Sequence, residues 1–285
     1  QDSQTPGNLV LGEGYLVVAQ AKNLTVFCQY EVLINRYRDL IVENPHSADP
    51  HFRLARAADA NGNDELAVEH YRATIELTTT NGPEEDRAIR QVAQTQLFSL
   101  LVHLGQIAAK ERNWARAEQH YREAADLAPS SQGRLDALLG LADEWRTAGE
   151  AAEPLGIYQE LLADDSLRGL TIQVEANRSV RVDVEVANRI EALLKQSGRE
   201  IYAPFDAAAN EVFAEAQQNG SLPTAERLLR THPNAQVVTQ ALVFLATQHA
   251  ANGQYAAAIA SYKQLLARPN TPVSLQVVAM QGIAQ

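Results

Sequence analysis

Residues 104–129 read LGQIAAKERNWARAEQHYREAADLAP, and this stretch decides the fold. Gly105 lies in an apolar segment, and Ala117 follows a polar turn at residues 111–113. Tyr121 comes four residues after Ala117, so both lie on one face of a helix. Small side chains at Gly105 and Ala117 would let two antiparallel helices approach closely, while Tyr121 would fill the space toward the next pair. The stretch therefore predicts a tightly packed helix pair.

The same spacing recurs at two other places, each with a small residue twelve positions before the alanine. The copies are Ala55, Ala67 and Tyr71, and Ala246, Ala258 and Tyr262. A weaker copy surrounds Tyr158. The pattern resembles the tetratricopeptide (TPR) repeat, whose nominal period is 34 residues. The resemblance implies an all-α, TPR-like superhelix, a solenoid that presents a binding surface rather than a catalytic pocket.

The first residues have a different pattern. Residues 8–28 contain short β-favouring runs around Gly12-Glu13-Gly14, which predicts a short N-terminal β-hairpin. The runs GNLV, GYLVV and LTVF within residues 7–28 also resemble the last strands of a PQQ-like β-propeller blade. That resemblance implies an upstream propeller domain of the same chain, as in large bacterial proteins that join a propeller to TPR-like helices.

Helix and breaker signals predict four segments. Residues 1–29 form the β-hairpin segment, a propeller remnant if the second resemblance holds, and residues 30–164 form TPR-like repeats. Residues 165–199 alternate like strands and then become helical, which predicts an inserted hairpin and a linker helix. Residues 200–285 form further TPR-like repeats. Pro154 replaces the small alanine of the third pair and fits only in the first turn of a helix.

Composition restricts the function. The formal net charge is −11, so nucleic acid is not an expected partner. Cys28 is the sole cysteine, which excludes an intramolecular disulfide, and no apolar run is long enough to predict a membrane span. The chain begins with Gln1 instead of methionine, so we expect a fragment whose targeting signal lay upstream. The compartment stays open, with the periplasm or cell envelope favoured if the propeller resemblance holds.

The polar motifs predict no catalytic, cofactor-binding or metal site. His70 and His120 each precede the repeat tyrosine, and this position predicts structural histidines rather than ligands. Gly12-Glu13-Gly14 lacks the third glycine and the helix that a dinucleotide loop needs. The acidic runs at residues 84–86 and 164–165 fit helix ends and loops better than paired catalytic carboxylates. We therefore expect no cofactor and no enzyme activity.

The TPR resemblance implies a partner-binding concave groove along the first helix of each pair. By register, its residues are Phe52, Arg56, Asp59, Val102, Gln106, Lys110, Leu139, Asp143, Arg146, Val243 and Thr247. The alternative, that several of these are ordinary surface residues, remains open. Phe52 and Arg56 occupy the places where chaperone-binding TPR domains carry their carboxylate clamp, so that clamp is absent. Mixed charges suit a protein or peptide partner.

The expected function is a non-catalytic protein–protein interaction scaffold, part of a larger bacterial protein. The alternative is a rigid helical spacer or docking module for an upstream propeller. A hydrolase or ligase would need an active site that the sequence does not show.

Overall fold

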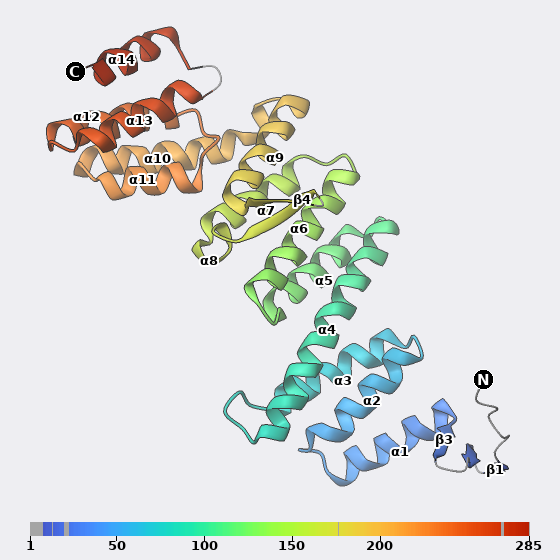
Figure 1. The fold of residues 1–285 in the computed structure, drawn as a ribbon. Helices are drawn as coiled ribbons and strands as arrows, with labels where there is room; N and C mark the ends of the chain where they lie inside the picture. The colour runs from blue at the N-terminus through green and yellow to red at the C-terminus, as the bar shows by residue number, and fades with distance from the viewer. Residues whose placement is uncertain (1–7, 13, 20–22, 176, 269–270, 285) are drawn as a thin grey trace, which may run out of the picture. The chain divides into compact units, whose positions relative to one another are not determined.

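The chain divides into two compact units, Gln1–Ala137 and Leu138–Gln285. The structure is a computed structural model, and it describes residues 8–284 except 13, 20–22, 176 and 269–270 (Figure 1). Residues 1–7, 13 and 20–22 of the predicted segment 1–29 lie outside the described part. Helices dominate both units, as the sequence predicts. Among the described residues, no helix combines the length and apolarity needed to cross a membrane.

The first unit opens with a three-stranded antiparallel sheet in the order β1-β2-β3. The strands are β1 (Asn8–Gly12), β2 (Tyr15–Ala19) and β3 (Leu24–Cys28). Gly14 makes the turn between β1 and β2 with a positive φ of 82°, a conformation that glycine adopts without strain. The predicted hairpin is present, and a third strand extends it.

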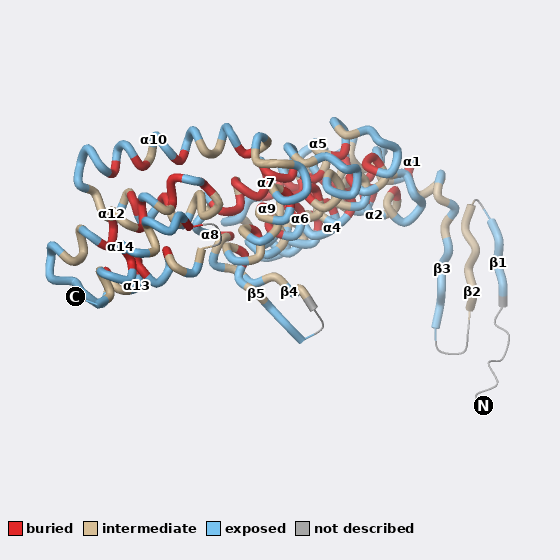
Figure 2. Tube along the Cα trace, turned by 90° about the horizontal axis from the view of Figure 1, so that it is seen from above, coloured by how far each residue is buried: buried red, intermediate tan, exposed pale blue. Residues whose placement is uncertain are grey.

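Both faces of this sheet carry apolar side chains. The register pairs Leu9 with Val18 on one face and Val10 with Val17 on the other, because residues directly opposite in an antiparallel pair point the same way. Leu9 is 68% exposed and Val10 is 62% exposed, and Figure 2 shows no buried residue on the described strands. Most of this apolar surface therefore remains uncovered by the helices of the unit.

Five helices follow the sheet in the first unit. They are α1 (Tyr30–Glu43), α2 (Ala48–Ala60), α3 (Asp64–Leu77), α4 (Glu84–Lys110) and α5 (Trp114–Leu127). Each packs on the next in sequence order, and α2 also packs on α4. The predicted pairs α2–α3 and α4–α5, including the lengthened α4, are confirmed.

Turns of the same kind connect the two helices within each of these pairs. Asn63 begins α3 and its side chain accepts a hydrogen bond from the amide of Leu66 at 3.3 Å. Asn113 begins α5 and caps the amide of Arg116 at the same distance. Such caps satisfy amide groups that have no partner inside the helix. These asparagines explain why both second helices begin where they do.

The repeat residues form the core of each pair. Ala55, Ala67 and Ala117 have no exposed surface, and Tyr71 and Tyr121 are 1% exposed. A Cβ atom added to Gly105 would lie 2.7 Å from Cδ2 of Tyr121, so the glycine is needed for this close approach. The tyrosine thus packs on the first helix of its own pair.

The second unit contains the remaining helices. It begins within α6 (Ser131–Thr147) and continues with α7 (Ala152–Ala163), α8 (Asp165–Arg168), α9 (Val182–Ser197) and a short 3-10 helix, η1 (Glu200–Tyr202). Five more helices follow: α10 (Ala203–Asn219), α11 (Leu222–Thr231), α12 (Val238–Ala251), α13 (Tyr255–Ala267) and α14 (Val273–Ala284). Pro154 is buried in the first turn of α7, as predicted.

The expected insertion lies between α8 and α9. Strands β4 (Thr171–Glu175) and β5 (Arg178–Arg181) pair antiparallel and project as a hairpin in Figure 2. The linker helix predicted after them is α9. At the other end of this unit, the ring of Tyr262 lies against Gly282 of α14. Here the repeat tyrosine does contact the next helix, as the sequence predicts.

A buried polar link joins three elements of the second unit. Gln159 of α7 donates a hydrogen bond from Nε2 to the carbonyl of Thr231, at the end of α11. Its Oε1 accepts a hydrogen bond of 3.1 Å from the hydroxyl of Tyr202 in η1. Gln159 and Tyr202 are both buried. Each of these polar groups has thereby found a partner inside the core, as buried polar groups require.

Candidate functional site

Helix α2 presents three of the predicted groove residues in one linked cluster. Phe52 is half-buried, and the guanidinium carbon of Arg56 lies 5.7 Å from the centre of its ring. Asp59 accepts a hydrogen bond of 3.1 Å from the hydroxyl of Tyr71. Burial and the neighbouring carboxylate of Asp59 raise the pKa of Tyr71. The Asp59 carboxylate therefore already has a hydrogen-bond partner in the core, whereas the Arg56 side chain is exposed.

Helix α4 carries the next three predicted residues at intervals of four, on one face. Gln106 and Lys110 are exposed, and Val102 is half-buried. Because α2 and α4 pack on each other, the structure brings these residues onto neighbouring helices of one unit. The resulting α2–α4 face consists of Phe52, Arg56, Asp59, Val102, Gln106 and Lys110.

The predicted residues of the second unit are placed less uniformly. Leu139 is only 8% exposed, so it is a core residue with little surface for a partner, contrary to its predicted place in the groove. Val243 is half-buried, and the hydroxyl of Thr247 bonds to the Val243 carbonyl of its own helix at 3.0 Å. Their place in a partner-binding groove stays a prediction.

Asp143 and Arg146 belong to a charge cluster that the sequence analysis missed in part. Asp143 pairs with Arg146 at 3.3 Å and with Arg189 of α9 at 3.2 Å. Arg189 also pairs with Glu185 at 2.9 Å. Burial opposes the charge of Arg189, but the bond to Glu185 and the charge of Asp143 outweigh it and raise the pKa of Arg189. Asp143 is therefore engaged by two arginines, and Arg146, although paired with it, keeps an exposed side chain.

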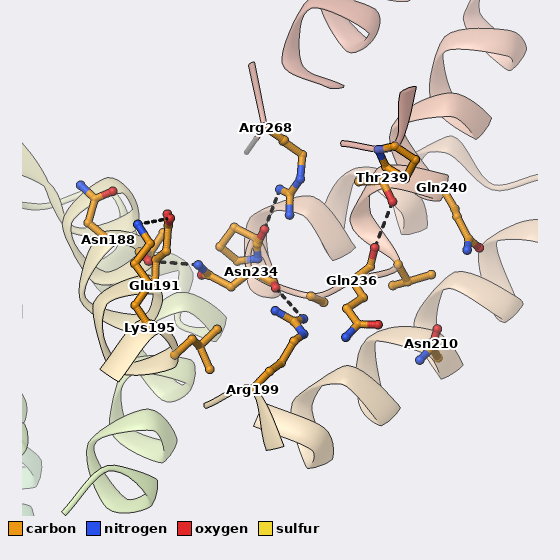
Figure 3. A pocket seen from close by; sticks show the side chains of 16 residues that line it. Asn188, Glu191, Lys195, Arg199, Asn210, Asn234, Gln236, Thr239, Gln240 and Arg268 are labelled. Atoms are coloured by element: carbon orange, nitrogen blue, oxygen red, sulfur yellow. Dashed lines mark hydrogen bonds and ion pairs between the residues drawn. The ribbon is translucent and has the colours of Figure 1, made fainter. Parts of the chain in front are cut away.

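A cleft of about 790 Å³ lies within the second unit (Figure 3). Its walls come from α9, Asn210 of α10 and the segment from residue 233 to 240, together with Arg199, Arg268 and Pro272. Arg199 and Arg268 point toward the Pro233–Gln236 loop from opposite sides. Arg199 donates to the carbonyl of Asn234 at 3.0 Å, and Arg268 donates to the carbonyl of Pro233 at 2.8 Å. No motif predicts this cleft, because its residues come from distant segments of the chain.

A second cleft, of about 770 Å³, lies on the second helices of the first unit. Arg72 of α3, which lines the cleft, forms a two-bond ion pair with Glu123 of α5, with both distances 2.6 Å. Arg116 and His120 of α5 also line it. We call the surface that carries Arg72, Arg116, His120 and Glu123 the α3–α5 face. It is the alternative to the α2–α4 face as a binding surface in the first unit.

Three histidines of the first unit, His51, His70 and His120, are partly buried in helix packing. His51 and His70 join α2 to α3 through their Nδ1 atoms, 2.9 Å apart, so at least one ring must be neutral to accept the bond. Burial lowers the pKa of His51, His70 and His120. The described residues contain no group of three or more histidine, cysteine or acidic side chains arranged to hold a metal ion.

These lowered pKa values predict an acid-sensitive first unit. Because the folded pKa values lie below the ordinary 6.5, the unfolded chain binds protons more readily, and stability present above pH 6.5 is lost as pH falls below it. We expect the urea midpoint to fall between pH 7.5 and 5.5. The fall should be smaller in His70→Gln and unchanged in a variant of the exposed His103, His103→Gln. An equal fall in His70→Gln and the original chain would contradict this assignment.

Paired antiparallel helices with a small-residue interface define an all-α helical-repeat fold of the tetratricopeptide type. The model of the tetratricopeptide repeat matches residues 100–135, which span the end of α4, all of α5 and the start of α6. The match includes Gly105, Ala117 and Tyr121, the residues that carry the pattern in the sequence.

Three solved structures are similar to the chain at low identity. The C-terminal part of a TPR repeat-containing protein from Cytophaga hutchinsonii has 15% identity and a TM-score of 0.29, covering 89% of this chain and 94% of its own. YrrB, described as a TPR protein with an unusual peptide-binding site, has 13% identity and a TM-score of 0.26, covering 88% and 97%.

BtubC from P. vanneervenii has 16% identity and a TM-score of 0.26, covering 89% of this chain and 90% of its own. At these values, none of the three supports an argument about partners or about the arrangement of the helices. No curated protein sequence gives a significant match.

Proposed function

We propose that the chain is a non-catalytic protein–protein interaction scaffold whose binding surface in the first unit is the α2–α4 face. The observation that carries the proposal is that two neighbouring, packed helices carry half-buried Phe52 and Val102 together with exposed Arg56, Gln106 and Lys110. Apolar side chains surrounded by polar ones are the usual anatomy of a protein interface. A protein or peptide is therefore the partner class that this face fits.

The test compares the two faces of the first unit. Truncating a buried aromatic anchor typically costs about 2 kcal/mol or more of binding, whereas a charge at the edge mainly changes salt dependence. We expect Phe52→Ala to weaken binding of a partner captured by the wild-type chain more than Arg116→Ala, on the α3–α5 face. The measurement is the dissociation constant of each variant by calorimetry.

Phe52 also lies near Tyr71, with ring centres 6.4 Å apart, so each variant needs a thermal melt to show that the unit stays folded. A partner that binds Phe52→Ala and the wild type equally, yet loses affinity in Arg116→Ala, would move the site to the α3–α5 face. Detection of a catalytic activity that survives purification and disappears with one substitution would contradict the non-catalytic assignment.

One observation favours a second function, in which the helices support an upstream β-propeller in a larger bacterial protein. The three-stranded sheet exposes apolar side chains on both faces, including Leu11 at 78% and Phe27 at 55% exposure. An isolated small sheet is marginally stable in water unless something covers it. Packing against further β-structure would cover both faces at once.

Hydrogen exchange tests this second function. If the sheet belongs to a propeller, amides of β1 and β3 should exchange quickly in the chain alone and slowly in the product of the whole gene. Amides of α2 serve as the internal control, because their partners lie within the first unit. Rapid exchange of β1 and β3 in both proteins would exclude a supporting role for the sheet.

A further inference from the structure

Arg268 is a partly buried cation without an acidic partner. It follows α13, and the one hydrogen bond of its guanidinium among the described residues goes to the carbonyl of Pro233 at 2.8 Å. It forms no ion pair with a described carboxylate. Burial first, and then the like charge of Arg199, lower the pKa of Arg268, and the opposing charge of Glu191 does not outweigh them. Burying a charge is costly unless an opposite charge or a set of hydrogen bonds compensates it.

The two carboxylates around this cleft, Asp206 and Glu191, already pair with other cations. Both oxygens of Asp206 accept from Arg199 at 2.8 and 2.9 Å, and Oδ1 also accepts from the amide of Gln236 at 2.8 Å. Glu191 pairs with Lys195 at 2.7 Å. Three cations therefore face two engaged carboxylates around this cleft, an excess of positive charge in a chain whose net charge is −11.

Side-chain amides also line the cleft, among apolar residues. Asn188, Asn210, Gln236 and Gln240 are labelled in Figure 3. A side-chain amide both donates and accepts, so it can pair with the N–H and C=O groups of an extended peptide. A guanidinium, in turn, matches a carboxylate with two parallel hydrogen bonds. The lining thus combines one position for negative charge with several for peptide backbone.

We propose that this cleft binds a carboxylate carried by an extended peptide, with Arg268 as the counter-ion and the amide side chains holding the peptide backbone. The proposal rests on the protein-binding function above, but it uses residues of the second unit only. Phe52→Ala therefore tests the α2–α4 face, and the experiment below tests the cleft. Failure of one leaves the other standing.

The experiment follows the side-chain Nε–H signals of Arg268 and Arg199 by nuclear magnetic resonance during titration with short peptides. The first probe is acetyl-Ala-Glu-Ala amide, with a side-chain carboxylate, and the second is acetyl-Ala-Gln-Ala with a free carboxyl terminus. The neutral control is acetyl-Ala-Gln-Ala amide, and inorganic phosphate tests a simple anion at matched ionic strength. We expect a saturable shift of the Arg268 signal with at least one carboxylate peptide and none with the neutral peptide. Which of the two peptides binds identifies the source of the carboxylate.

Two variants of equal charge provide the matched comparison. Arg268→Gln should weaken binding of the carboxylate peptide by about tenfold or more, because it removes the charged fork. Lys263→Gln removes the same charge from the exposed surface of α13 and should leave binding unchanged. If both variants lost the same affinity for the carboxylate peptide, the effect would come from net charge alone, and the proposal would be overturned.

Other results would also overturn it. These are a shift of the same size with the neutral peptide, or binding of phosphate without binding of either carboxylate peptide. Circular dichroism and a melt establish that Arg268→Gln is folded. If it is not, the comparison of charged and neutral peptides on the wild-type chain still decides the question.

Discussion

Replacing Gly105 with leucine is expected to lower the free energy of unfolding by about 1–3 kcal/mol through overpacking. A single Cβ atom at this position would already lie 2.7 Å from Cδ2 and 2.8 Å from Cε2 of Tyr121. Leucine adds three further carbon atoms in the same space, and the ring is 1% exposed with little room to move away. The helices α4 and α5 must then separate, so the urea midpoint should fall.

Gly156 supplies a control for the intrinsic effect of a helical glycine. It lies on the exposed face of α7, and a Cβ atom there would meet nothing within 4 Å. Gly156→Ala should therefore stabilise by about 0.5–1 kcal/mol, since alanine is the better helix former. A Gly105→Leu variant as stable as the original chain would show that the close approach of α4 and α5 is not as described.

Replacing Gln159 with leucine is expected to destabilise the second unit by about 2–4 kcal/mol, because two buried polar groups lose their partners. The hydroxyl of Tyr202 loses its acceptor at 3.1 Å, and the carbonyl of Thr231 loses its donor. Leucine is similar in size, so the cost comes mainly from the unpaired groups and not from a cavity. Urea denaturation, followed by a signal from the second unit, measures this change in the free energy of unfolding.

A double-mutant cycle isolates the bond between the two side chains. Tyr202→Phe alone should destabilise, since it removes the donor to Gln159. The same change in the Gln159→Leu background should cost less or stabilise, because it removes a hydroxyl that already lacks an acceptor. If the two changes in the free energy of unfolding were simply additive, the hydrogen bond between Gln159 and Tyr202 would be contradicted.

The sequence predicted the helix pairs well for a local reason. The breakers that separate them, such as Asn61-Gly62 and Ala128-Pro129, act on the residues next to them, and their effect is readable without the rest of the chain. Gly105 and Tyr121 were also predictable, since only small residues allow helices to approach closely. These signals come from neighbours in sequence or from a repeated spacing.

The candidate sites were harder to predict because they depend on contacts between distant segments. Leu139 was assigned to the groove by extending the repeat spacing of the first two pairs into α6. The third pair lacks the alanine on which this spacing is counted, because Pro154 stands in its place. The structure then buries Leu139. Arg199 and Arg268 are each an ordinary surface residue by type. Only the path of the chain around the Pro233–Gln236 loop brings them to one cleft.

The uncovered sheet of the first unit has a consequence for the behaviour of the chain at high concentration. In the described sheet, β1 and β3 are edge strands, and edge strands can pair with those of another copy. Pairing of β1 with β3 of a second copy leaves an unpaired edge at each end, so growth would be open-ended instead of stopping at a dimer. The net charge of −11 opposes such growth, and added salt screens that repulsion. Self-association of the isolated chain should thus rise with ionic strength, the reverse of an assembly held together by ion pairs.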